Sequence, residues 1–249
     1  KIKSLSGTAD VIKYTFGYVD DPKDTGNRPG IYIEFKEPWL NPTGFEEIVY
    51  KELDRLGMNI ITQPEPESNP FYVNGKVNTG NTNGKVILQT FSLESLVRVA
   101  EHFEGKVPMC FLLWKGTGAT DITYDDPLGY ASFINLGVKY KAHFIGPCIA
   151  GAPNNYPELN QPWQDYLIHK AGMKNHPYTF DTYDQMAKYF GQYNFGVEID
   201  GKYKAPYLDA LFTNHSDMSI NYMITQGWRK SPASETLVDA KVVLERLGY

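Results

Sequence analysis

Hydrophobic and polar positions along the chain follow two alternating patterns. Short, almost continuous apolar runs are typical of buried strands, and they are followed by stretches in which apolar residues recur every three or four positions, as on one face of a helix. The first pair is an apolar run at 31–36 and a helical pattern at 45–56, after which Gly57 provides a helix C-terminal signal. The chain therefore begins its regular pattern as strand followed by helix.

The same strand-then-helix pattern recurs five more times. The predicted strands are 85–91, 108–114, 143–149, 175–180 and 210–214. The predicted helices are 92–103, 130–136, 163–171, 183–190 and 218–225, with a last helix at 235–247. Alternation of this kind is typical of a parallel sheet covered by helices, in a doubly wound or a barrel arrangement.

Two stretches interrupt the alternation. Residues 62–84 are rich in Pro, Asn and Gly, which predicts an inserted surface loop rather than a linker between domains. A shorter interruption at 196–208 contains Val197-Glu-Ile-Asp-Gly201, whose Asp-Gly ending favours a hairpin or surface excursion over a metal site. We therefore expect residues 1–249 to form a single domain.

Length, charge and cysteine content narrow the class of protein. A chain of 249 residues is the size of one α/β barrel. Its 24 basic and 29 acidic residues give a net charge of -5, which argues against nucleic acid as a partner. No apolar run approaches the roughly 20 residues of a transmembrane helix, and the first residues indicate no compartment. The two cysteines, Cys110 and Cys148, are expected to be buried free thiols, with a single bridge as the alternative.

One predicted strand carries charge where a buried strand should not. In Ile31-Tyr-Ile-Glu-Phe-Lys-Glu-Pro38, Glu34 and Lys36 share one face of the strand, opposite Ile33 and Phe35. A charged pair on a buried strand is tolerated only when it is paired, bound to metal or open to a polar cleft. The pattern leaves two interpretations, a functional site at the strand end or a structural ion pair.

These residues carry a resemblance to a known family. Ile33-Glu-Phe-Lys-Glu-Pro38 resembles the third barrel strand of glycerophosphodiester phosphodiesterases, which reads Ile-Glu-Ile-Lys before a proline-containing loop. Further segments resemble the family in the correct order, namely Leu88–Leu96, Phe111–Trp114, His169–Phe180 and Asp209–Asn214. The resemblance implies a TIM (β/α)8 barrel, of which this chain supplies strands 3 to 8. It also implies metal-dependent hydrolysis of glycerophosphodiesters to glycerol 3-phosphate and an alcohol, with a divalent cation, Mg or Ca, and two catalytic histidines.

The family's first two strands have no counterpart here. His-Arg-Gly, Glu-Asn-Thr and the second His-Asp pair are absent, no Glu-x-Asp stands on a strand before residue 31, and none of the five histidines maps onto a catalytic one. We expect His102 and His169 in helices outside the barrel, His143 and His176 near strand starts, and His215 after the last strand, without a family role. No catalytic residue is therefore predicted in this chain. The two N-terminal strand-helix units are expected to be missing, and the catalytic histidines to lie upstream.

An incomplete barrel exposes strand edges. We therefore expect the chain to associate with the missing N-terminal fragment or with itself, and to be inactive alone.

Four residues take roles from the resemblance. Glu34 would be a metal ligand, because hard divalent cations prefer carboxylate oxygens. Lys36 would lie near the phosphoryl oxygens, Gln89 would hydrogen-bond phosphate or glycerol, and Tyr178 would line the mouth as an aromatic wall. A buried amide that satisfies strand ends is the alternative for Gln89, and core packing is the alternative for Tyr178.

Two other functions compete with hydrolysis. The first is a non-catalytic binding module on the same fold, which would hold a phosphorylated or polyol ligand in the same cleft. The second is a glycosidase with Glu34 and Glu37 as paired carboxylates. It is disfavoured, because residues three apart on a strand point to opposite faces.

Overall fold

A five-stranded parallel sheet forms the centre of the molecule. The computed structural model describes residues 31–36, 44–63, 72–73, 76–77, 86–115, 124, 126–193, 197–199, 203–205, 208–227 and 229. The strands of the sheet are β1 (Ile31–Glu34), β4 (Val86–Thr90), β5 (Met109–Leu113), β6 (Phe144–Pro147) and β7 (Lys174–Asn175). They lie in the order β1-β4-β5-β6-β7, and every neighbouring pair is parallel. The predicted parallel α/β fold is confirmed.

Residues 208–214 continue the sheet beyond β7 without forming a regular strand. The backbone N–H groups of Asp209 and Ala210 donate to the Asn175 carbonyl, and the Phe212 N–H donates to the Pro177 carbonyl. Phe180 N–H donates in turn to the Phe212 carbonyl. The predicted strand 210–214 therefore occupies a strand position, although its hydrogen bonds are too irregular for a ladder.

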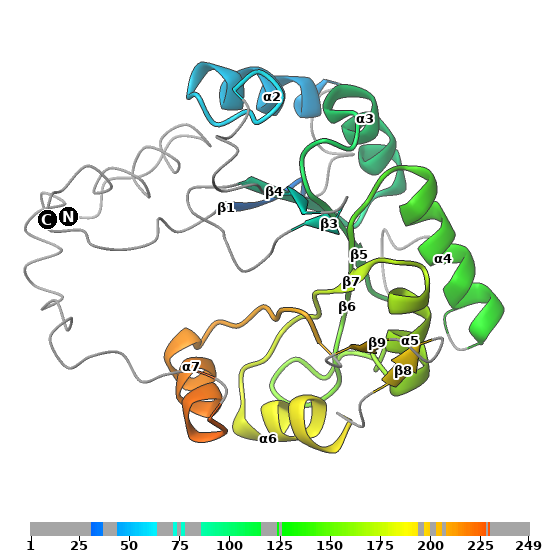
Figure 1. Ribbon diagram of the computed structural model, residues 1–249, viewed down its shortest axis with the longest axis vertical. Coiled ribbons are helices and arrows are strands. Elements are labelled where there is room, and N and C mark those ends of the chain that lie inside the picture. The colour runs from blue at the N-terminus through cyan, green and yellow to red at the C-terminus, as the bar shows by residue number, and fades with distance from the viewer. Residues whose placement is uncertain are drawn as a thin grey trace, which may run out of the picture.

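Helices cover the outer face of the sheet. α2 (Phe45–Arg55), α3 (Leu93–Phe103), α4 (Pro127–Lys139) and α5 (Pro162–Lys170) follow one another in an arc around it (Figure 1). Between these helices and the sheet lies the main hydrophobic core, to which alternate strand residues such as Leu88, Phe111 and Ile145 contribute. Helix-over-parallel-sheet packing of this kind explains why the strands read as continuous apolar runs.

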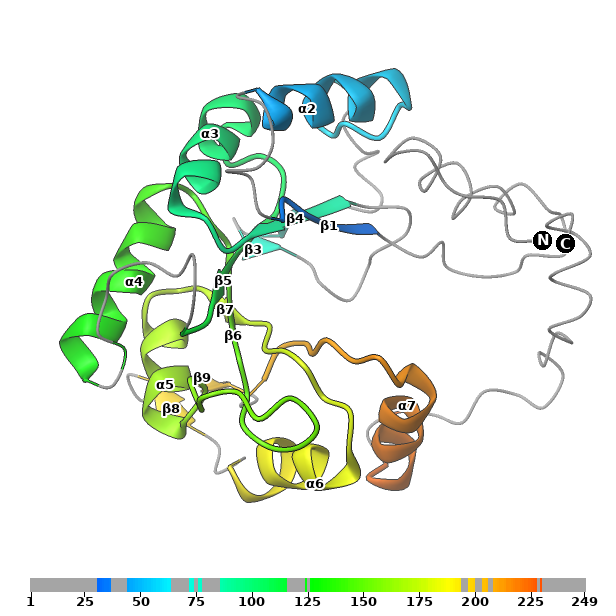
Figure 2. The same ribbon diagram turned by 180° about the vertical axis from the view of Figure 1, so that it is seen from behind.

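A second, smaller core lies at the end of the sheet opposite α2. Here α6 (Tyr183–Met186) runs into a π-helical turn (Ala187–Gln192), and both pack near α7 (Ser216–Thr225), as Figures 1 and 2 show. The buried residues of this core include Phe180, Tyr189 and Tyr222.

The inner face of the sheet carries a third, short row of buried side chains. Ile87, Cys110, Leu112 and Phe144 form this cluster, and Tyr32 packs against it. Both cysteines are buried and free, so the expected free thiols are confirmed and the alternative bridge is excluded.

Two antiparallel hairpins stand apart from the sheet. One pairs β2 (Tyr72–Val73) with β3 (Lys76–Val77), inside the stretch predicted as an inserted loop at 62–84. The other pairs β8 (Val197–Ile199) with β9 (Tyr203–Ala205), which confirms the predicted hairpin at this Asp-Gly sequence.

Several predicted boundaries shift in the structure. The helix predicted at 130–136 begins earlier, at Pro127, because the Asp126 side chain caps it by accepting from the N–H groups of Leu128 and Gly129. The strand predicted at 175–180 is only Lys174–Asn175 plus one bridge at Tyr178. The predicted helix 235–247 lies outside the described residues. None of the helices in the described residues is long and apolar enough to cross a membrane.

Candidate ligand-binding cleft

A cleft opens at the carboxyl ends of β1, β4 and β5. Its volume is about 240 Å³. The described residues that line it are Glu34, Gln89, Phe91, Leu112, Tyr178, Thr179, Phe212, Thr213 and Asn214. Ligand sites of parallel α/β folds lie at this end of the strands. Three of the four site residues predicted from the sequence, Glu34, Gln89 and Tyr178, therefore lie together in this cleft.

Glu34 is the ionisable group of the lining. It ends β1 and pairs in register with Gln89 of β4, so the two side chains lie on the same face of the sheet. Its Oε1 is buried and has no hydrogen-bond partner. Burial raises the pKa of the Glu34 carboxyl, and the positive charge of Lys36 opposes this shift. A buried carboxylate oxygen without a partner is costly, so this position favours a bound cation or a ligand hydroxyl.

Lys36 lies beyond the end of β1 and is exposed. It is not among the residues that line the cleft. Its charge acts on the Glu34 carboxyl, which places the two groups close enough to interact electrostatically. The charges of Glu34 and Lys36 therefore interact, as expected for a charged pair, but of the two only Glu34 lines the cleft.

Aromatic rings form one wall of the cleft. The Tyr178 ring meets the Phe91 ring edge to face, with centroids 5.7 Å apart. Its hydroxyl donates to the Leu113 carbonyl at a distance of 3.0 Å. Tyr178 therefore combines both interpretations made from the sequence, because it packs against Phe91 and also lines the cleft.

His176 lies on the inner face of the sheet, directly after β7. Its ring stacks on Phe144 with centroids 4.0 Å apart, and its Nδ1 lies 3.0 Å from the Tyr32 hydroxyl. Burial lowers the pKa of His176 to about 3, so the imidazole is neutral, and its Nε2 has no partner. The sequence predicted that His176 lies near the start of a strand. In the structure it directly follows the two-residue strand β7, and the sequence did not predict its position on the inner face.

The other four histidines also lie away from the cleft. His143 accepts from the Met109 N–H through Nδ1, and burial lowers its pKa to about 4. His102 lies on α3 and His169 on α5, which confirms their expected place in outer helices, and His215 precedes α7. All five histidines belong to the described part of the chain, and none of them lines the cleft.

Glu34 is a candidate ligand for a metal ion. Its unpartnered buried oxygen is a suitable donor for a hard divalent cation. Among the described residues, however, no group of three His, Cys, Asp or Glu side chains could hold a metal ion. Glu34 could therefore be one ligand of a bound cation, but the described residues do not form a complete cation site.

Comparisons with known proteins show the fold. No family model and no curated protein matches the sequence. A solved structure from Silicibacter pomeroyi DSS-3, of a protein assigned as a glycerophosphoryl diester phosphodiesterase, matches with a TM-score of 0.55 at 12% sequence identity. The match covers 90% of this chain, which spans 58% of the length of that protein. The resemblance noted in the sequence is thus confirmed at the level of the fold, because this chain shares the parallel α/β fold of that structure.

Proposed function

We propose that this chain forms the cleft of a phosphodiesterase and binds glycerophosphodiesters at the carboxyl ends of its strands. The observation that carries the proposal is the convergence of Glu34, Gln89 and Tyr178 in one cleft. These residues come from β1, β4 and the segment after β7, which are far apart in the sequence. The family resemblance implies ligand-site roles for all three residues, and their convergence in one cleft agrees with those roles.

Each residue has a role that its environment supports. The Gln89 amide carries both donor and acceptor atoms for a ligand hydroxyl or phosphoryl oxygen. The Tyr178 and Phe91 rings cover the apolar face of the bound alcohol. Lys36 is exposed beyond the end of β1, and its ammonium, which already acts on Glu34, would neutralise phosphate charge at long range.

Glu34 would hold a divalent cation, Mg or Ca, as one of its ligands. The cation would neutralise charge that develops on the phosphoryl oxygens during hydrolysis. The remaining cation ligands and the two histidines that act as acid and base would come from residues upstream of this chain. The strands described here would then correspond to strands 3 to 8 of the barrel, and the chain alone would bind without turnover.

A second function is favoured by the composition of the lining. Among the described residues that line the cleft, Glu34 is the one with a carboxylate or basic nitrogen, and none of the five histidines, all of which are described, accompanies it. A protein that only binds a phosphorylated or polyol ligand requires neither a general acid nor a general base. The alternative function is therefore a non-catalytic binding module.

Binding and turnover separate these functions. Glycerophosphocholine is titrated into the chain by calorimetry with and without Ca²⁺ or Mg²⁺, and released glycerol 3-phosphate is assayed in parallel. We expect cation-dependent binding that Glu34→Gln abolishes, and turnover only when the upstream segment is present. Binding without turnover in that longer protein would establish the binding module. Failure of the wild-type chain to bind at millimolar ligand would overturn both functions.

A further inference from the structure

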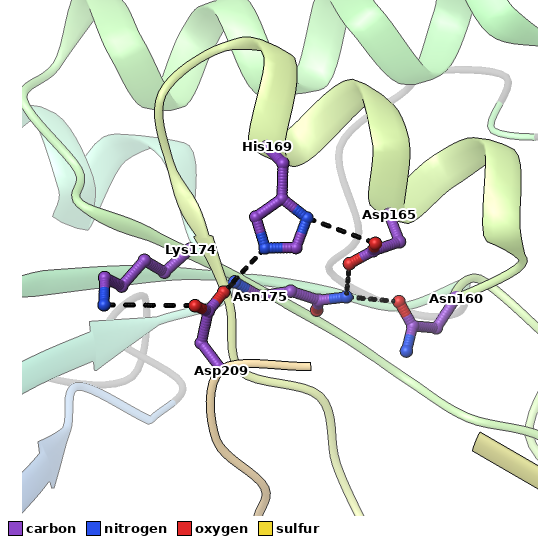
Figure 3. A network of polar contacts seen from close by, with 6 residues as sticks. All are labelled: Asn160, Asp165, His169, Lys174, Asn175 and Asp209. Carbon is purple, nitrogen blue, oxygen red and sulfur yellow. Dashed lines mark hydrogen bonds and ion pairs between the residues drawn. The ribbon is translucent and has the colours of Figure 1, made fainter. Parts of the chain in front are cut away.

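A buried polar network joins α5, β7 and the segment 208–214 (Figure 3). His169 lies between two carboxylates, with Nδ1 3.1 Å from Asp165 Oδ2 and Nε2 2.8 Å from Asp209 Oδ2. The side chains of His169, Asp165 and Asp209 are 4%, 0% and 6% exposed, so the whole triad is shielded from water. Asp165 and His169 are four residues apart on α5, which places them on one face of the helix.

The Asp209 carboxylate acts as the hydrogen-bond acceptor for one backbone N–H of β7. The Lys174 N–H donates to the carbonyl of His143, just before β6, and the His176 N–H donates to the Ile145 carbonyl of β6, as alternate residues of a parallel strand do. The Asn175 N–H points to the other side, and there Asp209 Oδ2 accepts it at 2.8 Å. The Asn175 carbonyl accepts from the N–H groups of Asp209 and Ala210 in return. Asp209 therefore sets the point at which the segment 208–214 joins β7.

Other contacts hold the same carboxylates. Lys174 Nζ lies 3.9 Å from Asp209 Oδ1, and the Asn175 side-chain amide donates to both Asp165 Oδ1 and Asn160 Oδ1 at 2.7 Å. His169 touches both aspartates through its ring, as Figure 3 shows, and Asn175 also touches both, through its backbone N–H and its side-chain amide. The network thus ties an outer helix to the last segment of the sheet, with His169 as its link from α5 to Asp209.

The segment fixed in this way supplies a wall of the cleft. Phe212, Thr213 and Asn214 follow Asp209 by three to five residues, and all three line the cleft. A shift of one residue in the pairing of such a segment turns its side chains to the opposite face. The far end is held separately, because the Asn214 N–H donates to Asp181 Oδ1.

We propose that His169 is a positioning residue, which acts through Asp209 to fix the register of the cleft wall 212–214. It touches no ligand itself, since it lies on α5 at the opposite end of these strands from the cleft. The proposal rests on the proposed function only for its ligand measurement. The position of the wall is tested without any ligand.

A matched pair of variants separates positioning from general stabilisation. Asp209→Asn and Asp165→Asn make the same chemical change at buried partners of His169, but only Asp209 belongs to the wall segment. Amide hydrogen exchange of the full chain is measured at Ala210, Phe212 and Asn214, with the β4 amides as the internal reference. His169→Ala is measured in the same way.

We expect Asp209→Asn and His169→Ala to speed exchange at Ala210 and Phe212 about tenfold or more relative to β4, because a charge-assisted contact is lost, and to affect Asn214 less, because its N–H is held by Asp181. Asp165→Asn should change the exchange rates of the segment 208–214 and of β4 by about the same factor. If all three variants change the exchange rates of the segment 208–214 and of β4 by the same factor, the proposal is wrong. If His169→Ala does not fold, the two asparagine variants decide the question by themselves.

The ligand measurement then reports on function. Glycerophosphocholine affinity should fall in Asp209→Asn and stay near the wild-type value in Asp165→Asn. Equal affinities in the two variants would contradict positioning of the wall. A wild-type chain that binds no glycerophosphocholine would overturn the proposed function, and the exchange data would still decide the role of His169.

Discussion

Glu34 and Gln89 pair in register across the parallel strands β1 and β4, and both side chains line the cleft. The pairing puts a carboxylate beside an amide at the point where the strands end. Gln89 can donate to a ligand that Glu34 also contacts, and it adds no charge that would compete with a cation. This pair is the chemical centre of the candidate site, and the predictions on binding start from it.

Glu34→Gln should remove cation binding and leave the fold intact. The lost group is a carboxylate with an unpartnered buried oxygen and a pKa raised by burial, so its neutral replacement should not lower the free energy of unfolding at pH 7. Calorimetric titration with Ca²⁺ and Mg²⁺ checks the first part, and urea unfolding checks the second. Glu101→Gln, an exposed change on α3, is the control. Equal cation affinity in both variants would exclude Glu34 as a ligand.

Lys36→Ala should weaken binding of anionic ligands only modestly. Lys36 is exposed and does not line the cleft, so its ammonium acts through solvent, where one charge contributes about 1 kcal/mol or less. The affinity for glycerophosphocholine should therefore fall by less than about tenfold, and the loss should diminish as salt rises. Titrations at two ionic strengths measure this. A large, salt-independent loss would show that Lys36 contacts the ligand directly.

Much of this site could be predicted from the strand pattern. Glu34, Gln89 and Tyr178 lie at the ends of apolar runs, and parallel strands bring their carboxyl ends to one edge of the sheet. The alternation of strands and helices likewise predicted the sheet and the outer helices. Such signals are local, because each depends on the period of a short stretch of sequence.

The remaining features depend on contacts between distant residues. His176 stacks on Phe144 of β6 and contacts Tyr32 of β1, and both partners are distant in the sequence. The role of Asp209 depends on the Asn175 N–H, which faces away from β6, and on His169 of α5. The sequence predicted a strand at 210–214, but it did not predict these contacts of Asp209, which lies just before it. These features arise from tertiary pairing, which the sequence period does not encode.

Glu46→Ala should destabilise the fold, although it lies far from the cleft. Its buried carboxylate on α2 accepts from Arg98 Nε at 2.8 Å and from the Ser95 hydroxyl at 2.6 Å, both on α3. Loss of this link leaves Ser95 without its acceptor, and we expect a cost of about 2 kcal/mol in urea unfolding. Glu47→Ala is the control, because its pair with Lys51 is exposed and should change little.

Acid should weaken the same link. Burial raises the pKa of Glu46, but the hydrogen bonds from Arg98 and Ser95 outweigh it, so the pKa lies below its ordinary value. A carboxyl with a lowered pKa contributes stability above its unfolded pKa and loses it as pH falls. The difference in stability between wild type and Glu46→Ala should therefore shrink below about pH 4.5. A difference that stays constant to pH 3 would contradict this.

Alkali should weaken the His169 network. Burial alone would lower the pKa of His169, but the contacts with Asp165 and Asp209 raise it to about 10. Stability from a raised histidine pKa is complete below the unfolded value and is lost as pH rises through the folded one. The advantage of wild type over His169→Gln should therefore decline between about pH 6.5 and 10. Thermal unfolding across this range measures it, and an advantage that stays constant from about pH 6.5 to 10 would contradict the raised pKa of His169.

His176 should produce the opposite dependence, with stability lost in acid. Burial lowers its pKa to about 3, so the folded chain keeps the ring neutral while the unfolded chain protonates it near pH 6.5. The contribution of neutral His176 is therefore complete above that pH and declines as pH falls towards 3. Between pH 7 and 4 the loss should reach about 3 kcal/mol, which urea unfolding can resolve.

His143 adds a loss of the same sign, because its pKa is lowered to about 4. His176→Gln should remove its own share while that of His143 persists. An unchanged acid slope in His176→Gln would show that His176 is not buried in the neutral form.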